Sequence, residues 1–182
     1  MSKFLNRFSP FDLIIISLLS ACGIAIKPFV RLLTQMAVGT FIPAGTVAGI
    51  IYMIWIVLAC AIVKKRGTAI LVGIVQSVLV VVFDMLGNRG IANLLTYVVP
   101  GIVLELGMLL VPKYVHSMLT GFFAGMLANA TGSLIVGAVF MRMPVIPLIV
   151  SLMVGGVSGG IGGVIGYRLA EIVRMFKKTE SY

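Results

Sequence analysis

The sequence predicts an all-α, polytopic membrane protein, and its composition and the spacing of its apolar stretches predict this class. Of the 182 residues, 60% are hydrophobic and only 10% are charged, and the mean hydropathy is +1.19. In a soluble globular protein roughly a quarter of the residues are charged. Gly, Pro and charge clusters divide the apolar sequence into six segments, each close to the ~20 residues that cross a hydrocarbon core of about 30 Å. We therefore expect residues 1–182 to form one integral membrane domain of six transmembrane helices.

The six expected helices follow one another along the chain. We place them at residues 11–26, 44–63, 68–86, 91–111, 115–140 and 145–173. The first segment lacks the small-residue cleavage site of a signal peptide and is followed by further spans, so we expect it to be retained.

The Lys and Arg residues predict the orientation of these spans, because positive residues in short loops stay on the cytoplasmic side. Ten of the 14 fall on one face of a six-span protein: Lys3, Arg7, Lys64, Lys65, Arg66, Lys113, Arg168, Arg174, Lys177 and Lys178. Both termini are then cytoplasmic, in a multi-pass protein of the cell membrane. The net charge of +9 is dispersed among hydrophobic spans, so we expect no nucleic-acid partner.

The other four basic residues fall on the outer face, where the orientation rule does not explain them. They are Lys27, Arg31, Arg89 and Arg142. Lys27 and Arg31 lie between the first two spans, Arg89 lies in the loop after the third, and Arg142 lies in the loop before the sixth. These four residues are candidates for holding a ligand.

Polar and aromatic residues gather in the same outer half. They are Asp84, Asn88, Thr96 and Tyr97, together with Tyr52 and Trp55. Such a set suits a small ligand with a flat ring and polar or anionic groups, because aromatic faces stack on the ring while Arg and Asn fix its edges. The alternatives are an interfacial aromatic belt, an Asp84–Arg89 ion pair, and lipid phosphate on Arg142.

Two further polar residues lie within predicted spans, where an unpaired polar group is costly. Glu105 is flanked by Leu104 and Leu106 in the fourth span, so we expect it to be protonated, to face a cavity or to meet a partner such as Gln76. Asn129 in the fifth span is a weaker candidate, because a neighbouring helix can satisfy an Asn side chain.

Small residues predict close helix packing. The last span carries seven glycines between Gly155 and Gly166, and Gly121 and Gly125 offer a similar surface in the fifth span. In the first span Ser17, Ala21 and Ala25 repeat every four residues and share one helix face. That face meets either another helix of this chain or a separate membrane subunit.

The sequence gives little support to catalysis. It has one His, no paired carboxylates and no Ser with an evident base, so we expect no catalytic residues, no metal site and no cofactor. Cys22 and Cys60 fall inside predicted helices and form no metal or redox spacing. A gradient-driven small transporter or channel, and a structural membrane subunit, remain open as alternatives to a binding protein.

Several motifs resemble those of the substrate-binding S components of energy-coupling factor (ECF) vitamin transporters, and most closely the YkoE-like group linked to thiamine precursors. The similarity runs through Tyr52 and Trp55, the segment from Lys64 to Ala69, the residues Leu86, Gly87, Asn88 and Gly90, and Glu105. Size, span count and topology agree along the whole chain.

This resemblance implies a non-enzymatic subunit that binds a vitamin or precursor at its outer face and works with a transmembrane coupling subunit and two cytoplasmic ATPases in the lipid bilayer. A thiamine-related precursor is the first expectation, with a cobalamin precursor or another vitamin next. By position, the resemblance implies substrate contacts from Asp84, Asn88, Arg89, Tyr97, Glu105, Asn129 and Arg142, with Trp55 as a wall. It also implies that the Ser17, Ala21 and Ala25 face docks the coupling subunit.

Overall fold

The computed structural model describes residues 5–38, 44–83 and 92–179, and these residues form helices joined by turns, with no strand among them. The elements are α2 (Pro10–Ala25), α3 (Lys27–Val38), α4 (Ala44–Val63), α5 (Thr68–Phe83), α6 (Ala92–Leu109), α7 (Met118–Leu134), the π-helix η1 (Ile135–Phe140) and α8 (Val145–Thr179). The expected all-α membrane fold is confirmed.

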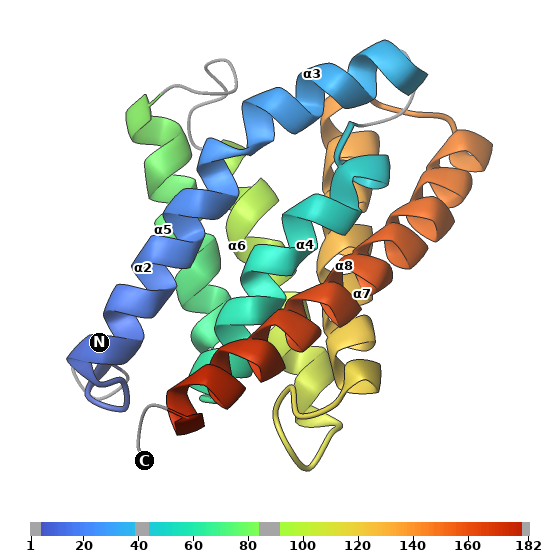
Figure 1. Ribbon diagram of the computed structural model, residues 1–182. Helices are drawn as coiled ribbons and strands as arrows, with labels where there is room; N and C mark the ends of the chain where they lie inside the picture. The colour runs from blue at the N-terminus through green and yellow to red at the C-terminus, as the bar shows by residue number, and fades with distance from the viewer. Residues whose placement is uncertain (1–4, 39–43, 84–91, 180–182) are drawn as a thin grey trace.

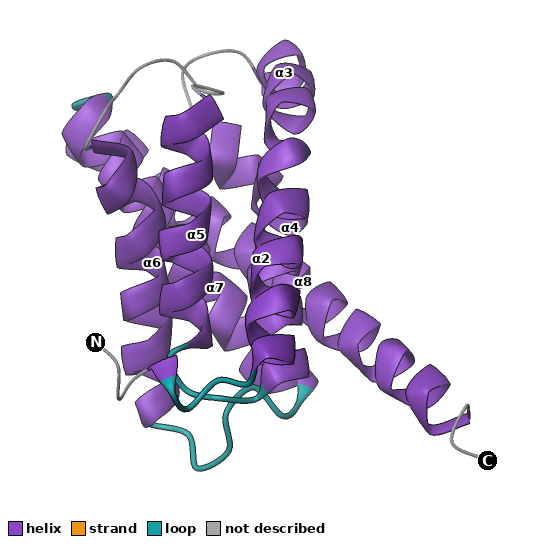
Figure 2. Ribbon diagram, turned by 90° about the vertical axis from the view of Figure 1, so that its left-hand side faces the viewer, coloured by secondary structure: helices purple, strands orange, loops and turns teal. Residues whose placement is uncertain are grey.

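The helices pack as a bundle with two distinct ends (Figure 1). The start of α2, the loops 64–67 and 110–117 and the end of α8 lie at one end, while α3 and the connection from η1 to α8 lie at the other (Figures 1 and 2). An ion pair of 2.5 Å between Lys65 Nζ and Asp12 Oδ2 joins the first end, and Arg174 donates to the carbonyl of Ala61 there. We call this the basic end, and the other the α3 end.

Four helical stretches are long and apolar enough to cross a membrane. They are Pro10–Ala37, Gly45–Val63, Met118–Phe140 and Val145–Phe176, while Thr68–Phe83 and Leu94–Leu109 are apolar but shorter. These six stretches correspond in order to the six expected spans. The number of membrane crossings and the cytoplasmic position of the termini stay predictions.

Residues 27–38, which lie between the first two expected spans, form the additional helix α3. Pro28 stands at the start of this helix, a position that needs no backbone N–H donor. Phe29, Leu33 and Met36 recur every three or four residues and are exposed. Helix α3 therefore has an apolar outer face, and it extends α2 over the start of α4 (Figure 1).

The fifth and sixth expected helices have boundaries that differ from the expected ones. Ser117 and Thr120 form a reciprocal capping box, so the fifth span begins at Met118 rather than at residue 115. Val115 precedes it with a φ of 33°, which a helix does not allow. Helix α8 continues to Thr179, six residues beyond the expected end.

The glycines bring α4, α7 and α8 into backbone contact, as the sequence predicted. A Cβ at Gly125 would collide with the carbonyl of Gly159, and one at Gly163 would collide with that of Gly121. A Cβ at Gly166 would lie 2.6 Å from the carbonyl oxygen of Ile54 in α4. Small residues are the means by which membrane helices approach this closely.

Candidate functional site

A lysine lies between two tyrosines where α2 meets α3. Lys27 Nζ lies 4.0 Å from the ring centroid of Tyr97 in α6 and 5.4 Å from that of Tyr52 in α4. The Tyr52 hydroxyl donates a 3.3 Å hydrogen bond to the carbonyl of Lys27. Cation–π contacts of this kind hold an ammonium over aromatic faces. Three helices thus fix one cation and two phenols near the α3 end.

Two buried polar groups, one on α2 and one on α4, have no hydrogen-bond partner in the described part of the chain. They are the hydroxyl of Ser20 and the indole N–H of Trp55. Buried polar groups are nearly always paired, by protein, water or ligand. Two buried polar groups without a partner among the described residues are therefore a reason to expect a bound molecule.

Gly23 lies where helix α2 comes close to helices α4 and α5. A Cβ at Gly23 would lie 3.1 Å from Trp55 Cβ and 2.9 Å from Gln76 Nε2, so α2 approaches α4 and α5 here. Ser20 lies one turn before Gly23, and Lys27 one turn after it, on the same side of the chain. We call Ser20, Lys27, Tyr52, Trp55 and Tyr97 the junction cluster.

A second buried polar cluster lies on the other side of α4. It consists of Thr46, Asn129, Ser133, Ser151 and Ser158, all buried. We call it the paired cluster. Asn129 Nδ2 donates to the carbonyl of Gly155 at 2.8 Å and to Ser158 Oγ at 3.1 Å.

The remaining members of the paired cluster satisfy one another. The Thr46 hydroxyl lies 3.2 Å from Ser133 Oγ and 2.9 Å from Ser151 Oγ, and Ser158 donates to the Thr46 carbonyl. These bonds join α4, α7 and α8. Asn129 therefore links helices, and the structure places it apart from the junction cluster.

Glu105 lies toward the basic end, eight residues along α6 from Tyr97. Its Oε1 accepts hydrogen bonds from the backbone N–H of Ala69 at 3.0 Å and from the Tyr114 hydroxyl at 2.5 Å. Burial, with the neighbouring Cys60 and Glu105, raises the pKa of Tyr114 well above its ordinary value, so the phenol keeps its proton and donates. Gln76 is not the partner of Glu105. The carboxylate ties the start of α5 to the loop after α6.

Three of the predicted substrate contacts, Asp84, Asn88 and Arg89, lie outside the described residues. Arg142 is exposed, with a φ of 47°, in the turn between η1 and α8 at the α3 end. Of the predicted set, Tyr97 contacts Lys27 and Trp55 lies against Gly23, whereas Glu105 and Asn129 bond to other partners.

The three small residues of the first span face outward. Ser17, Ala21 and Ala25 are exposed, and the exposed Ile14 and Leu18 flank them. This face of α2 is open to lipid or to another subunit. Its docking role stays a prediction.

Sequence reasoning named Lys27 and Tyr52 as outer residues but did not connect them, and it missed Ser20. The missing signal was the stripe of Ser20, Gly23 and Lys27, which recurs every three or four residues on the side of the first helix away from Ser17 and Ala21. A Ser and a Lys on the inward side of an apolar helix need partners, and that need identifies the interface.

Comparisons with known proteins agree with this architecture. Residues 11–131 match the family model described as "ABC-type cobalt transport system, permease component". A crystal structure of an S component of an ECF transporter has the same fold, with a TM-score of 0.75 and 18% sequence identity over 93% of this chain and 87% of that one. The search of curated proteins found no match.

The family match covers most of the chain, and the structural match covers nearly all of it. This chain is a multi-pass protein of the cell membrane with the S-component fold, and it belongs to the family of ABC-type cobalt transport system permease components.

Proposed function

We propose that this chain is the substrate-binding subunit of an ECF-type importer and that it captures a small, planar, heteroaromatic vitamin or vitamin precursor at the α3 end. The observation that carries the proposal is the junction cluster, in which a cation contacts two phenol rings, and in which the indole N–H of Trp55 and the hydroxyl of Ser20 are buried without a hydrogen-bond partner among the described residues. Ligand sites commonly combine an apolar or aromatic lining with a few polar groups that fix orientation.

The chemistry of the cluster favours a ring with acceptor atoms. The phenol rings of Tyr52 and Tyr97 offer stacking faces, and Trp55 and Lys27 donate hydrogen bonds and cannot accept them in these states. A pyrimidine with ring nitrogens and a hydroxyl or phosphate substituent meets these demands. A thiamine-related precursor is the first choice on the sequence resemblance, and a cobalamin precursor or another vitamin is next.

The family's description names cobalt, but the junction cluster suits an organic ligand better. Transition metals prefer imidazole, thiolate or carboxylate ligands, whereas this cluster offers an amine, two phenols, an indole and a hydroxyl. Because the family's description names cobalt, cobalt(II) is included among the compounds to be tested.

The proposed subunit works with a transmembrane coupling protein and two cytoplasmic ATPases. The outward small-residue face of Ser17, Ala21 and Ala25 is the proposed contact with the coupling protein, because small residues permit close approach of a partner helix. The bond from Tyr114 to Glu105 leaves that carboxylate in a supporting role at the basic end.

The test is identification of small molecules that copurify with the detergent-solubilised protein, by mass spectrometry, followed by thermal shift with a panel. The panel holds thiamine, its hydroxymethylpyrimidine precursor, its phosphates, a cobalamin precursor and cobalt(II). We expect one heteroaromatic compound to be retained and to raise the unfolding temperature.

A matched pair of variants ties this binding to the junction cluster. Lys27→Met should weaken binding of that compound about 30-fold, the equivalent of ~2 kcal/mol for a charge-assisted contact. Lys113→Met, which removes an exposed lysine at the basic end, should leave affinity unchanged. Equal effects of the two variants, or stabilisation by cobalt(II) alone, would contradict the proposal.

A gradient-driven transporter remains the competing function. Uptake into cells distinguishes the two, because an ECF subunit imports only when the coupling protein and ATPases are present. Uptake by this chain alone, abolished by an ionophore, would favour the competitor.

A further inference from the structure

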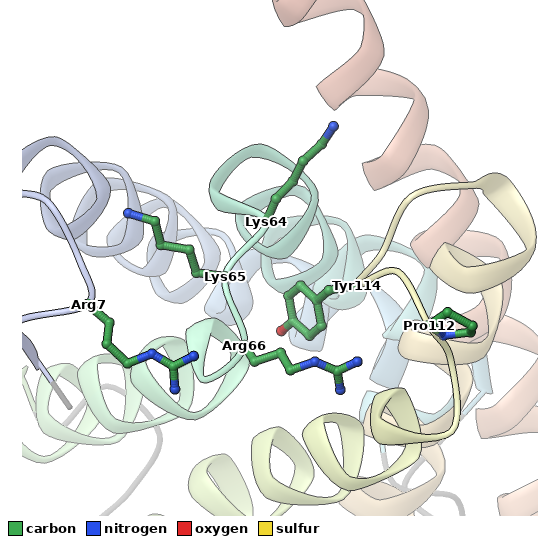
Figure 3. Close-up of a pocket in the computed structure, with 6 residues that line it drawn as sticks. All are labelled: Arg7, Lys64, Lys65, Arg66, Pro112 and Tyr114. Carbon is green, nitrogen blue, oxygen red and sulfur yellow. The ribbon is translucent and has the colours of Figure 1, made fainter.

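A pocket of about 470 Å³ opens at the basic end of the bundle, far from the junction cluster. Its lining consists of Arg7, Lys64, Lys65, Arg66, Pro112 and Tyr114 (Figure 3). The volume is within the range of about 300–1,000 Å³ that holds small molecules. Four of its six lining residues are cations, which makes an anion the complementary ligand.

Two of these cations are already engaged. Lys65 pairs with Asp12, and Arg66 donates to the carbonyls of Met108 and Val111 at 3.0 and 2.9 Å. The Arg66 bonds pair it with neutral groups, so its charge is not cancelled. The charge of Lys65 is offset by its ion pair with Asp12.

The other two cations, Arg7 and Lys64, are exposed and extend from the start of the chain and from the loop after α4 (Figure 3). The Tyr114 hydroxyl is directed to Glu105 instead of the pocket. With the carboxylates of Asp12 and Glu105 counted against the four cations, the pocket region keeps an excess of two positive charges.

Apolar side chains adjoin this charged pocket. Leu109 and Leu110 are 61% and 89% exposed, and they precede Pro112 of the lining. Leu5, exposed by 38%, lies two residues before Arg7. The two bonds from Arg66 hold the turn that carries Leu110 against the pocket. The site therefore offers an anion pocket with an apolar border, which a free inorganic ion does not require.

The pocket also lies at the level where the apolar helices end. Helix α2 begins at Pro10, α5 begins at Thr68 and α6 ends at Leu109, all next to lining residues. Basic pockets between membrane helices at this level bind anionic lipid headgroups.

We propose that this pocket binds the phosphate headgroup of an anionic phospholipid, with Arg7 and Lys64 adding positive charge at its border and Leu110 along the acyl chains. The lipid belongs to the leaflet at the basic end. This site is separate from the vitamin site and does not depend on it.

The test uses the full-length protein in detergent and native mass spectrometry with three probes: phosphatidylglycerol, phosphatidylcholine and inorganic phosphate. We expect one phosphatidylglycerol to be retained in preference to phosphatidylcholine, and inorganic phosphate at the same concentration neither to bind nor to displace it. Each cation near a lipid surface contributes about 1 kcal/mol, so Lys64→Gln should weaken phosphatidylglycerol binding about fivefold. Combining it with Arg7→Gln should weaken it about 25-fold.

Lys113→Gln is the matched control, because Lys113 is exposed at the same end but does not line the pocket. It should change affinity by less than twofold. The lipid proposal fails if both lipids bind equally, if Lys113→Gln matches Lys64→Gln, or if inorganic phosphate competes fully.

It also fails if the double variant keeps phosphatidylglycerol but no longer assembles with the coupling subunit and ATPases, since the pocket would then receive an acidic protein segment. Unfolding temperatures measured without lipid identify a variant that is merely unstable, and in that case Lys64→Gln alone decides the test.

Discussion

The junction cluster and the paired cluster lie on opposite sides of α4, and both contain polar side chains buried among apolar helices. In the paired cluster, Asn129, Thr46 and Ser158 donate to and accept from one another or nearby carbonyls. In the junction cluster the Ser20 hydroxyl and the Trp55 indole have no partner among the described residues. A buried polar residue in a membrane bundle therefore indicates binding only when its hydrogen bonds are incomplete, and indicates helix association when they are complete.

The largest effect should come from the glycine contacts beside the paired cluster. Gly163→Ala places a Cβ against the backbone of Gly121, so we expect a loss of about 2–3 kcal/mol in the free energy of unfolding. The matched control is Gly156→Ala in the same helix, where the new Cβ would meet only the Met126 side chain at 3.4 Å. Denaturation in mixed micelles measures both. If both variants lost the same free energy of unfolding, the close backbone contact at Gly163 would not be the cause of the loss.

Asn129→Leu tests whether the paired cluster is structural. The change removes three interhelical hydrogen bonds, to the Thr46 carbonyl, the Gly155 carbonyl and Ser158 Oγ, and keeps the same number of side-chain heavy atoms. We expect a loss of about 1–2 kcal/mol in stability with ligand affinity unchanged. Thr131→Val is the control on α7, because that hydroxyl donates only to Leu127 of its own helix. A large loss of ligand affinity in Asn129→Leu at unchanged stability would instead place Asn129 in the binding site.

Trp55→Phe tests the opposite expectation for the junction cluster. The indole N–H makes no hydrogen bond to any residue that the structure describes, so its removal should cost little stability. Ligand affinity should fall about fivefold, since one neutral hydrogen bond contributes ~1 kcal/mol. Titration calorimetry measures the affinity and thermal unfolding the stability. A drop in stability without a change in affinity would show that the indole packs the core and does not meet ligand.

Glu105→Gln should have the smallest effect. The amide oxygen can still accept from Ala69 N–H and Tyr114, so we expect less than twofold change in ligand affinity and a loss of less than ~0.5 kcal/mol in stability. The same calorimetric titration checks this. A tenfold loss of affinity would restore the sequence-based expectation that Glu105 contacts the ligand.

Most of the fold follows from the sequence, because apolar stretches predict where the membrane helices lie and glycines predict where helices pack closely. The start of α4 agrees with the expected one, and the glycines of α7 and α8 meet as predicted. Helix α3 was not predicted, since the charged residues Lys27 and Arg31 lie between the first two apolar spans. Its periodic exposed face, with Phe29 and Met36, was the available signal.

The site was harder to predict, because a polar residue in a span does not by itself reveal its partner. Glu105, Asn129 and Tyr97 look alike as single letters in apolar runs, yet one holds a loop, one joins helices and one stacks on a cation. Which helices face one another decides among these roles. Small residues such as Gly23 determine which helices approach closely, and no single polar residue reveals this.

Trp55 gives the proposed site a built-in spectroscopic reporter. It is the single tryptophan of the chain, and its buried indole N–H has no partner in the described part of the protein. Indole emission responds to the polarity and hydrogen bonding around the ring. All tryptophan fluorescence of the purified protein therefore comes from one position in the junction cluster, so the arrival of an unlabelled molecule can be followed in real time.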